Sequence, residues 1–266
     1  MGEAEPLLRT ISDTALWTAL YRARESERPD ALFHDPYARR LAGQRGAQIA
    51  AEVHFADQHA WSLTARTVLL DQMILKSIAG GADLIVNLAA GLDTRPYRLA
   101  LPPSLRWVEV DFAPIFDYKE AGLGSERPIC KLQRIRLDLA EVSARRDLFQ
   151  QLGSTARRAL VFCEGLLIYF TPGQASALAR DLAAVPGFQH WAFDLVNPAL
   201  LRMLQKRMGT AVEQAGAPFQ FGPSTGPDFF ASCGWKTLEA HSLLKTAHRL
   251  NRLPLGMRLL ATLPQP

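Results

Sequence analysis

Acidic side chains recur at points where apolar runs of this chain end. Residues 84–88 form such a run, and the small-residue segment Ala89-Ala90-Gly91 follows it directly. Asp111 ends a second run, 20 residues beyond Gly91. In doubly wound folds, an acid at that distance from a small-residue turn commonly binds ribose hydroxyls. The spacing therefore indicates a nucleoside-containing ligand; the alternative is that Asp111 caps the helix that follows.

Two further acids, Asp138 and Glu164, close later strand candidates. In such folds, a side chain at the position of Asp138 can reach the edge of a bound adenine. The alternative is that Asp138 caps the helix expected near Glu141. In a sheet ordered 3-2-1-4-5, the first and fourth strands are neighbours, so Glu164 is expected to face the Gly91 loop. Burying an unpaired carboxylate is costly. This favours a ligand ammonium or an acceptor substrate as the partner of Glu164.

Several classes of site are disfavoured. The loop lacks the Gly-x-Gly-x-x-Gly pattern that exposes backbone amides to a pyrophosphate, which argues against a nicotinamide oxidoreductase. Cys130, Cys163 and Cys233 are widely spaced and odd in number. They are expected to be reduced core thiols of a cytoplasmic protein. Neither the cysteines nor the six histidines have metal-ligand spacing, so no metal site is expected.

The elements that must position these residues alternate in type. Residues 12–27 and 61–79 carry apolar side chains at helical spacing, and Asp35-Pro36 marks another helix start. Strands are then expected at 84–88, 106–111, 133–138, 159–163 and 190–196, with helices at 114–121, 141–152 and 172–184. This alternation predicts an α/β doubly wound, mainly parallel sheet. Two more strands are expected at 235–241 and 257–263, the last antiparallel, for a total of seven.

Composition limits the class of partner. The 266 residues are 48% hydrophobic and 21% charged, with a net charge of +4. The basic residues are scattered rather than gathered in a stripe, so no nucleic acid partner is expected. No apolar run approaches the roughly 18–20 residues that span a membrane. The first residues contain no apolar core of a signal peptide, so a cytoplasmic protein with a small-molecule partner is expected.

The chain resembles a known family, the leucine carboxyl methyltransferase-like methyltransferases, which includes the tetracenomycin-type polyketide O-methyltransferases. The segments that carry the resemblance run in family order over some two thirds of the chain. They are His34-Asp35-Pro36-Tyr37-Ala38, Thr64-Ala65-Arg66, residues 87–99, Trp107-Val108-Glu109-Val110-Asp111, Asp138-Leu139 and Glu164-Gly165-Leu166-Leu167-Ile168-Tyr169.

The resemblance implies a Rossmann-like class I methyltransferase fold and S-adenosyl-L-methionine as the cofactor. It implies one domain over 1–266: an N-terminal helical cap at 1–80, and a cofactor-binding core at 81–266 with a helical lid inserted around 197–225. The cofactor-binding residues that it implies are Arg66, Gly91, Asp111, Asp138, Leu139 and Glu164.

The resemblance also implies a role for each of these residues. Arg66 would hold the cofactor carboxylate and Glu164 its amino group, with Gly91 against the methionyl part. Asp111 would bind the ribose, and the pair Asp138-Leu139 the adenine. Catalysis would depend on positioning, with no catalytic side chain. Without the resemblance, Arg66 is simply a solvated residue of an amphipathic helix.

Two positions are less regular. The family usually has glycine where this chain has Ala89, and a methyl group there would crowd the cofactor. Phosphatase-methylating members use an N-terminal basic residue, for which Arg22 or Arg24 is the nearest equivalent here.

The sequence thus predicts an O-methyltransferase acting on a carboxylate or hydroxyl of a small molecule, such as a polyketide or another secondary metabolite. The alternatives are a non-catalytic cofactor-binding protein of the same fold, or a methyltransferase acting on a protein carboxylate or RNA.

The first testable prediction concerns the choice of cofactor. Calorimetry should detect binding of S-adenosylmethionine or its demethylated product, and no binding of NAD. Asp111→Ala should weaken binding by about 1.5–3 kcal/mol, the range for a lost hydrogen bond to a charged group. Tight NAD binding without S-adenosylmethionine binding would overturn the assignment.

Overall fold

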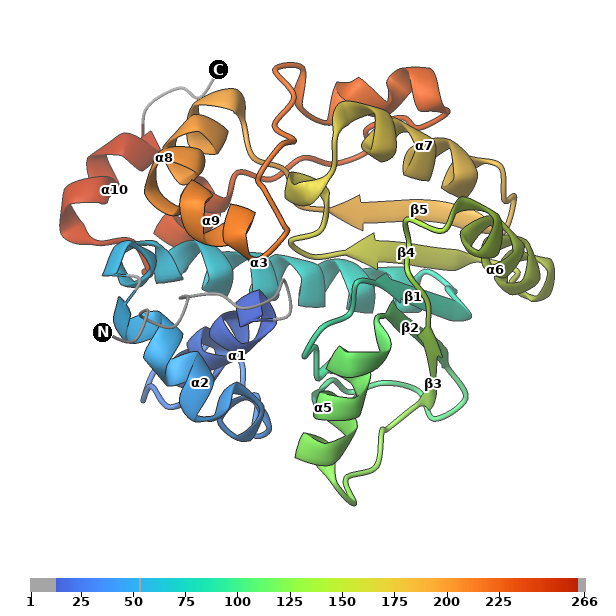
Figure 1. Ribbon diagram of the computed structural model, residues 1–266. Helices are drawn as coiled ribbons and strands as arrows, with labels where there is room; N and C mark the ends of the chain where they lie inside the picture. The colour runs from blue at the N-terminus through green and yellow to red at the C-terminus, as the bar shows by residue number, and fades with distance from the viewer. Residues whose placement is uncertain (1–12, 53, 263–266) are drawn as a thin grey trace, which may run out of the picture.

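The computed structural model describes residues 13–52 and 54–262, and its sheet has five parallel strands in the order β3-β2-β1-β4-β5. Figure 1 shows the strands ending at a common edge near the middle of the molecule. The strands are β1 (Leu84–Leu88), β2 (Arg106–Asp111), β3 (Lys131–Arg136), β4 (Ala159–Cys163) and β5 (Phe188–Phe193).

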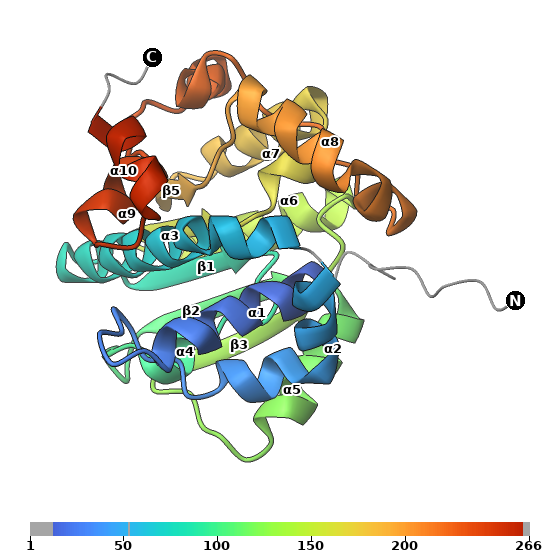
Figure 2. The same cartoon turned by 90° about the vertical axis from the view of Figure 1, so that its left-hand side faces the viewer.

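Helices flank the sheet on both faces. Figures 1 and 2 show α7 and α8 in the upper part of the molecule and α1, α2 and α5 in the lower part. The helices are α1 (Asp13–Ser26), α2 (Ala38–Glu52), α3 (His54–Ala79), α4 (Arg95–Arg98), α5 (Ala113–Leu123), α6 (Val142–Thr155), α7 (Pro172–Ala183), α8 (Pro198–Gln214), α9 (Leu243–Arg249) and α10 (Leu255–Thr262), with the short 3-10 helices η1 (Leu167–Tyr169) and η2 (Gly226–Cys233).

The strand residues divide between two apolar layers because side chains alternate along a strand. Val86 and Val161 pack towards Phe149 of α6 and its neighbours. Ile85 packs on the opposite face with Ile74 of α3. Every residue of β1 and β4 is buried, as expected for central strands covered on both faces. The sheet is therefore a rigid base whose carboxyl edge can hold a site.

The sequence prediction of the α/β fold and of the strand order is confirmed. Strands β1, β2 and β4 have the predicted bounds, whereas β3 and β5 begin two residues earlier than predicted. The three cysteines are buried free thiols. Among the helices of the described residues, none has the length and apolar character needed to cross a membrane.

The predicted sixth and seventh strands are wrong within the described residues. Residues 235–241 are irregular, and α10 is a helix where a strand was expected; Leu263 lies outside the described residues. Met257 and Ala261, one helical turn apart, pack with Ala65 of α3 and Ala247 of α9. A short apolar run fits a strand or a helix equally well, and this packing selects the helix. The sheet therefore has five strands, not seven.

A buried charge cluster joins β2 to the helix that follows it. Glu109 and Lys119 are both fully buried, and Lys119 Nζ donates to Glu109 Oε1 at 2.8 Å. Arg134, its neighbour on β3, donates to Glu109 Oε2 at 3.0 Å. Burial raises the pKa of Glu109, and the two cations counteract that rise. The cluster fixes α5 against β2 just before Asp111.

Lys119→Met should lower the free energy of unfolding by about 3 kcal/mol, because breaking a buried ion pair leaves an underpaired charge. Urea unfolding checks this value. Lys131→Met, at an exposed position of β3, is the matched control and should change stability by less than about 0.5 kcal/mol. If Lys119→Met unfolds at the urea concentration of the parent, then Arg134 alone neutralises Glu109.

Candidate active site

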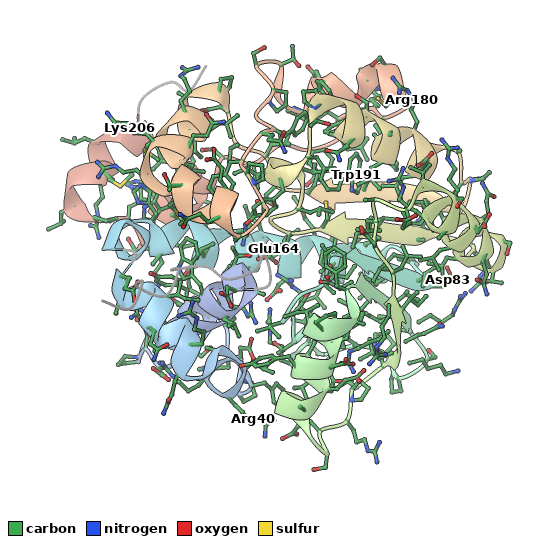
Figure 3. All side chains as sticks on the ribbon, in the orientation of Figure 1. Arg40, Asp83, Glu164, Arg180, Trp191 and Lys206 are labelled. Atoms are coloured by element: carbon green, nitrogen blue, oxygen red, sulfur yellow. The ribbon has the colours of Figure 1, made fainter. Side chains whose placement is uncertain are left out.

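The carboxyl ends of the strands open into a cavity of about 1520 Å³. Figure 3 shows Glu164 near the middle of the molecule, at this edge, and Asp83 at the opposite end of the sheet. The cavity wall includes the six residues predicted from the sequence, Arg66, Gly91, Asp111, Asp138, Leu139 and Glu164. Residues from α3 and from four strand ends are thus brought together.

The loop after β1 is fastened to the end of β2. The Gly91 backbone N–H donates to Asp111 Oδ2 at 2.6 Å, and the Phe112 N–H donates to Oδ1 at 2.7 Å. Burial raises the pKa of Asp111, and these two N–H groups counteract the rise. Each carboxylate oxygen has two lone pairs. Asp111 therefore keeps acceptor capacity for ligand hydroxyls while it holds the loop.

Ala89 has a left-handed backbone, with φ of +55°. Gly91 follows at φ of +48°. Glycine adopts this region freely, whereas a residue with a Cβ pays roughly 1–2 kcal/mol. The tight turn of the loop thus gives a physical reason why glycine would be favoured at position 89, where this chain has alanine.

Asp138 and Leu139 lie just beyond β3. Asp138 Oδ1 accepts from the Ala140 N–H at 2.8 Å, and α6 begins after Glu141, so Asp138 shapes its own turn. Leu139 is buried, and its carbonyl accepts from Arg145 Nη1 at 2.6 Å. These two hydrogen bonds stabilise the turn, and both Asp138 and Leu139 line the cavity.

Arg66 and Glu164, assigned to opposite ends of a cofactor amino acid group, contact each other directly. Arg66 Nε donates to Glu164 Oε1 at 3.0 Å, and Arg66 Nη1 donates to Asp194 Oδ2 at 3.0 Å. Only 13% of the Arg66 side chain is exposed, so its interpretation as a solvated helix residue is wrong. Burial would raise the pKa of Glu164, but Arg95 and Arg66 outweigh burial and lower it. Glu164 is therefore a carboxylate at neutral pH.

The charged cluster extends behind Glu164. Arg95 Nη1 donates to Glu164 Oε2 at 2.9 Å, and its Nε donates to Asp71 at 2.6 Å. Arg95 also contacts Asp93 at 2.7 Å. Burial would raise the pKa of Asp93, but the charges of Arg95 and Lys119 outweigh it and lower the value to about 2. Cations and carboxylates thus alternate from α3 through the loop after β1 to the end of β4.

Sequence reasoning missed Asp194 and Arg95. Asp194 directly follows β5. An acid at the end of a strand is the signal that identified Asp111 and Glu164, but the predicted fifth strand, 190–196, placed Asp194 in its interior. Arg95 lies in the recognised loop, but its burial against Glu164 depends on the strand order. The side-chain contacts of the cluster could not be predicted from the sequence, because they join segments far apart in the chain.

Of the two N-terminal arginines, Arg22 reaches the cavity. It lines the wall, donates through Nε to Asp35 at 2.9 Å, and donates through Nη2 to the Leu92 carbonyl at 2.6 Å. Arg24 instead lies over the Tyr21 ring at 5.2 Å. Arg22 therefore fastens α1 to the loop that carries Gly91.

Beyond the charged cluster the wall is largely apolar. Trp17 of α1 and Trp61 of α3 line it, together with Met208 of α8 and Phe219 after that helix. Met208 and Phe219 also pack with Tyr21 in one apolar cluster. Phe221, which falls in the same predicted lid stretch, is core instead and packs on Phe229 and Phe230. The cavity thus has a polar end at the sheet and an apolar end under α8.

This geometry defines a class of protein: a doubly wound α/β protein with a crevice at the carboxyl edge of its sheet, the place where such folds bind ligands. The sequence profile of one family, "Leucine carboxyl methyltransferase", matches residues 15–183. The chain belongs to the leucine carboxyl methyltransferase family, as the resemblance predicted.

Curated relatives agree with this membership. A candidate S-adenosyl-L-methionine-dependent methyltransferase of Streptomyces avermitilis is 29% identical, over 82% of this chain and 75% of that protein. Another from Saccharopolyspora erythraea is 34% identical, over 69% of this chain and 67% of that protein. Relatives from Mycobacteroides abscessus and Streptomyces coelicolor are matched over 65% and 58% of their own lengths.

Solved structures confirm the fold. A DUF574 family protein from Streptomyces avermitilis superposes with a TM-score of 0.55 at 16% identity, over 80% of this chain and 81% of that one. A candidate methyltransferase from Thermobifida fusca gives a TM-score of 0.54 at 15% identity, over 95% and 92% of the two chains.

Ala89→Gly should relieve the backbone strain at position 89. The free energy of unfolding should stay constant or rise by up to about 1 kcal/mol, since relief of strain exceeds the added flexibility of the unfolded chain. Cofactor affinity should improve or stay unchanged. Ala90→Gly is the control, because Ala90 has no positive φ, and it should lose about 0.5–1 kcal/mol. A large loss of affinity in Ala89→Gly would mean that the loop follows another path when it binds.

Proposed function

We propose that this chain is an S-adenosylmethionine-dependent methyltransferase that moves a methyl group onto an oxygen of a small molecule. The observation that supports this most is one cavity with two different ends. Asp111, Gly91 and the Arg66–Glu164 pair form a polar end suited to a nucleoside with an amino acid group. The end under α8 is apolar and suited to an organic acceptor.

The polar side chains of the cavity match the functional groups of this cofactor. The Asp111 carboxylate accepts hydrogen bonds from the hydroxyl groups of a ribose, and the turn at Asp138 and Leu139 binds an adenine edge. Arg66 holds a carboxylate, a contact that suits a planar guanidinium. Glu164 is ionised and holds an ammonium. A free amino acid group carries both charges, so it can exchange with the internal Arg66–Glu164 pair without leaving a net buried charge.

The cofactor supplies the reactive methyl group, and the residues of this chain provide alignment and a dry environment. The charged cluster holds one end of the cavity in fixed geometry. Trp17, Trp61 and Met208 give the other end an apolar wall, which disfavours bound water there. Alignment in a water-excluding site is the main protein contribution to such a displacement.

The acceptor is proposed to be a carboxylate or a hydroxyl of a secondary metabolite, such as a polyketide. A carboxylate has an unperturbed pKa of about 4 and is already ionised, so it needs no general base. A phenol, with a pKa of about 10, would need one. We propose that the enzyme acts in the cytoplasm, in keeping with its three buried free thiols.

Mass spectrometry with labelled cofactor tests the proposal. Candidate carboxylic acids and phenols are incubated with the protein, and a gain of one methyl is sought. Mild base separates the products, because it cleaves a methyl ester and leaves a methyl ether intact. Cofactor binding without any product would favour the non-catalytic alternative. Label on a co-purified protein or RNA would favour a macromolecular acceptor.

Arg66→Ala should weaken binding of the cofactor by about 1.5–3 kcal/mol, and Arg66→Lys by less, because lysine keeps the charge and loses the planar fork. Calorimetry checks both values. Because Arg66 neutralises two carboxylates, Arg66→Ala should also lower stability, so binding is compared well below its unfolding temperature. Arg157→Ala, with an exposed side chain at the other end of the sheet, should bind like the parent. Parent-like binding by both Arg66 variants would reassign α3 to packing.

A further inference from the structure

Asp194 uses both of its carboxylate oxygens at the edge of the site. Oδ2 accepts from Arg66 Nη1 at 3.0 Å, and Oδ1 accepts from the Gly165 backbone N–H at 2.7 Å. Gly165 has φ of +69°, and a Cβ there would lie 3.4 Å from Arg66 Nη1. The guanidinium thus packs against the Gly165 turn while Asp194 binds both groups. One side chain after β5 ties together α3, the turn after β4 and its own strand.

We propose that Asp194 is a positioning residue that sets the direction of Arg66 for the amino acid end of the cofactor. The inference rests on the proposed function, because it assigns Arg66 to the cofactor carboxylate. Asp194 is not among the cofactor-binding residues predicted from the sequence.

The geometry explains why Arg66 needs a second anion. Glu164 and Asp194 each engage a different nitrogen of the guanidinium, which divides its charge between them. Without Asp194, the favoured arrangement of arginine with a single carboxylate is bidentate. Arg66 would then close further onto Glu164, whose Oε2 already accepts from Arg95, and would take up acceptor capacity that is assigned to the ammonium. Asp194 therefore keeps Arg66 from a bidentate contact with Glu164 and leaves acceptor capacity on Glu164 for a ligand.

The competing interpretation is structural: Asp194 would only fasten the Gly165 turn to β5. The two interpretations differ in which part of the cofactor responds. A positioning role affects the amino acid end alone. A purely structural role disturbs the turn and hence the whole crevice.

Two variants and two probes separate these roles. Asp194→Ala removes both contacts. Asp194→Asn keeps an oxygen for the Gly165 N–H but turns an N–H₂ group towards Arg66, so it removes the Arg66 contact selectively. The probes are S-adenosylmethionine and 5′-methylthioadenosine, an adenosine thioether that lacks the amino acid group. Dissociation constants are measured by calorimetry, and folding is followed by thermal unfolding.

Both variants should bind S-adenosylmethionine about tenfold more weakly than the parent and bind 5′-methylthioadenosine within about twofold of it. In an Arg66→Ala background, Asp194→Asn should cause little further loss, since coupled residues are non-additive. Asp83→Asn is the matched control, because Asp83 also accepts backbone N–H groups and pairs with an arginine, at the opposite end of the sheet. It should bind both probes like the parent.

Parent-like binding of S-adenosylmethionine by Asp194→Asn and Asp194→Ala would overturn the inference and leave the proposed function intact. An equal loss of both probes would also overturn it, in favour of the structural role. If Asp194→Ala does not fold, Asp194→Asn and the double variant decide between these outcomes. A parent that binds neither probe would overturn the proposed function itself, and the inference with it.

Discussion

The ion pair between Arg66 and Glu164 is the contact on which the site depends. It joins α3, which precedes the sheet in the chain, to the end of β4, 98 residues later. Neither charge would be tolerated alone in this partly buried place, because an unpaired buried charge is costly. The pair therefore fixes α3 across the strand ends. Once α3 is fixed, α1 and its Trp17 have a surface against which the apolar end of the cavity forms.

A second constraint acts through the backbone. Asp111 holds the Gly91 amide, and Asp93 of the same loop holds Arg95, which in turn binds Glu164. The loop after β1 is thus fastened on both sides, towards β2 and towards β4. Such a loop cannot shift easily to relieve the strain at Ala89. Pre-organisation of this kind lowers the cost of ordering a site when a ligand binds.

The fold was largely predictable because its signals are local. Short apolar or half-apolar segments bounded by turn residues identified the five strands, and their alternation with helices indicated a doubly wound sheet. The order 3-2-1-4-5 was expected because it is common in such sheets, and the structure has it. The signal failed after residue 234, where short apolar stretches fit either a strand or a helix. There, contacts of Met257 and Ala261 with α3 and α9 decided for a helix, and such contacts cannot be read from local pattern.

For the site, the sequence by itself determined which acids lie at a strand end or just beyond it: Asp111, Asp138 and Glu164. Strand ends follow from local pattern, and parallel strands bring their ends to one edge. Only the tertiary structure decided which charges meet. That Arg66 lies between Glu164 and Asp194 depends on how α3 crosses the sheet. The crossing depends both on this ion pair and on apolar packing of Ile74 against the strands, and these are long-range contacts that no short segment encodes.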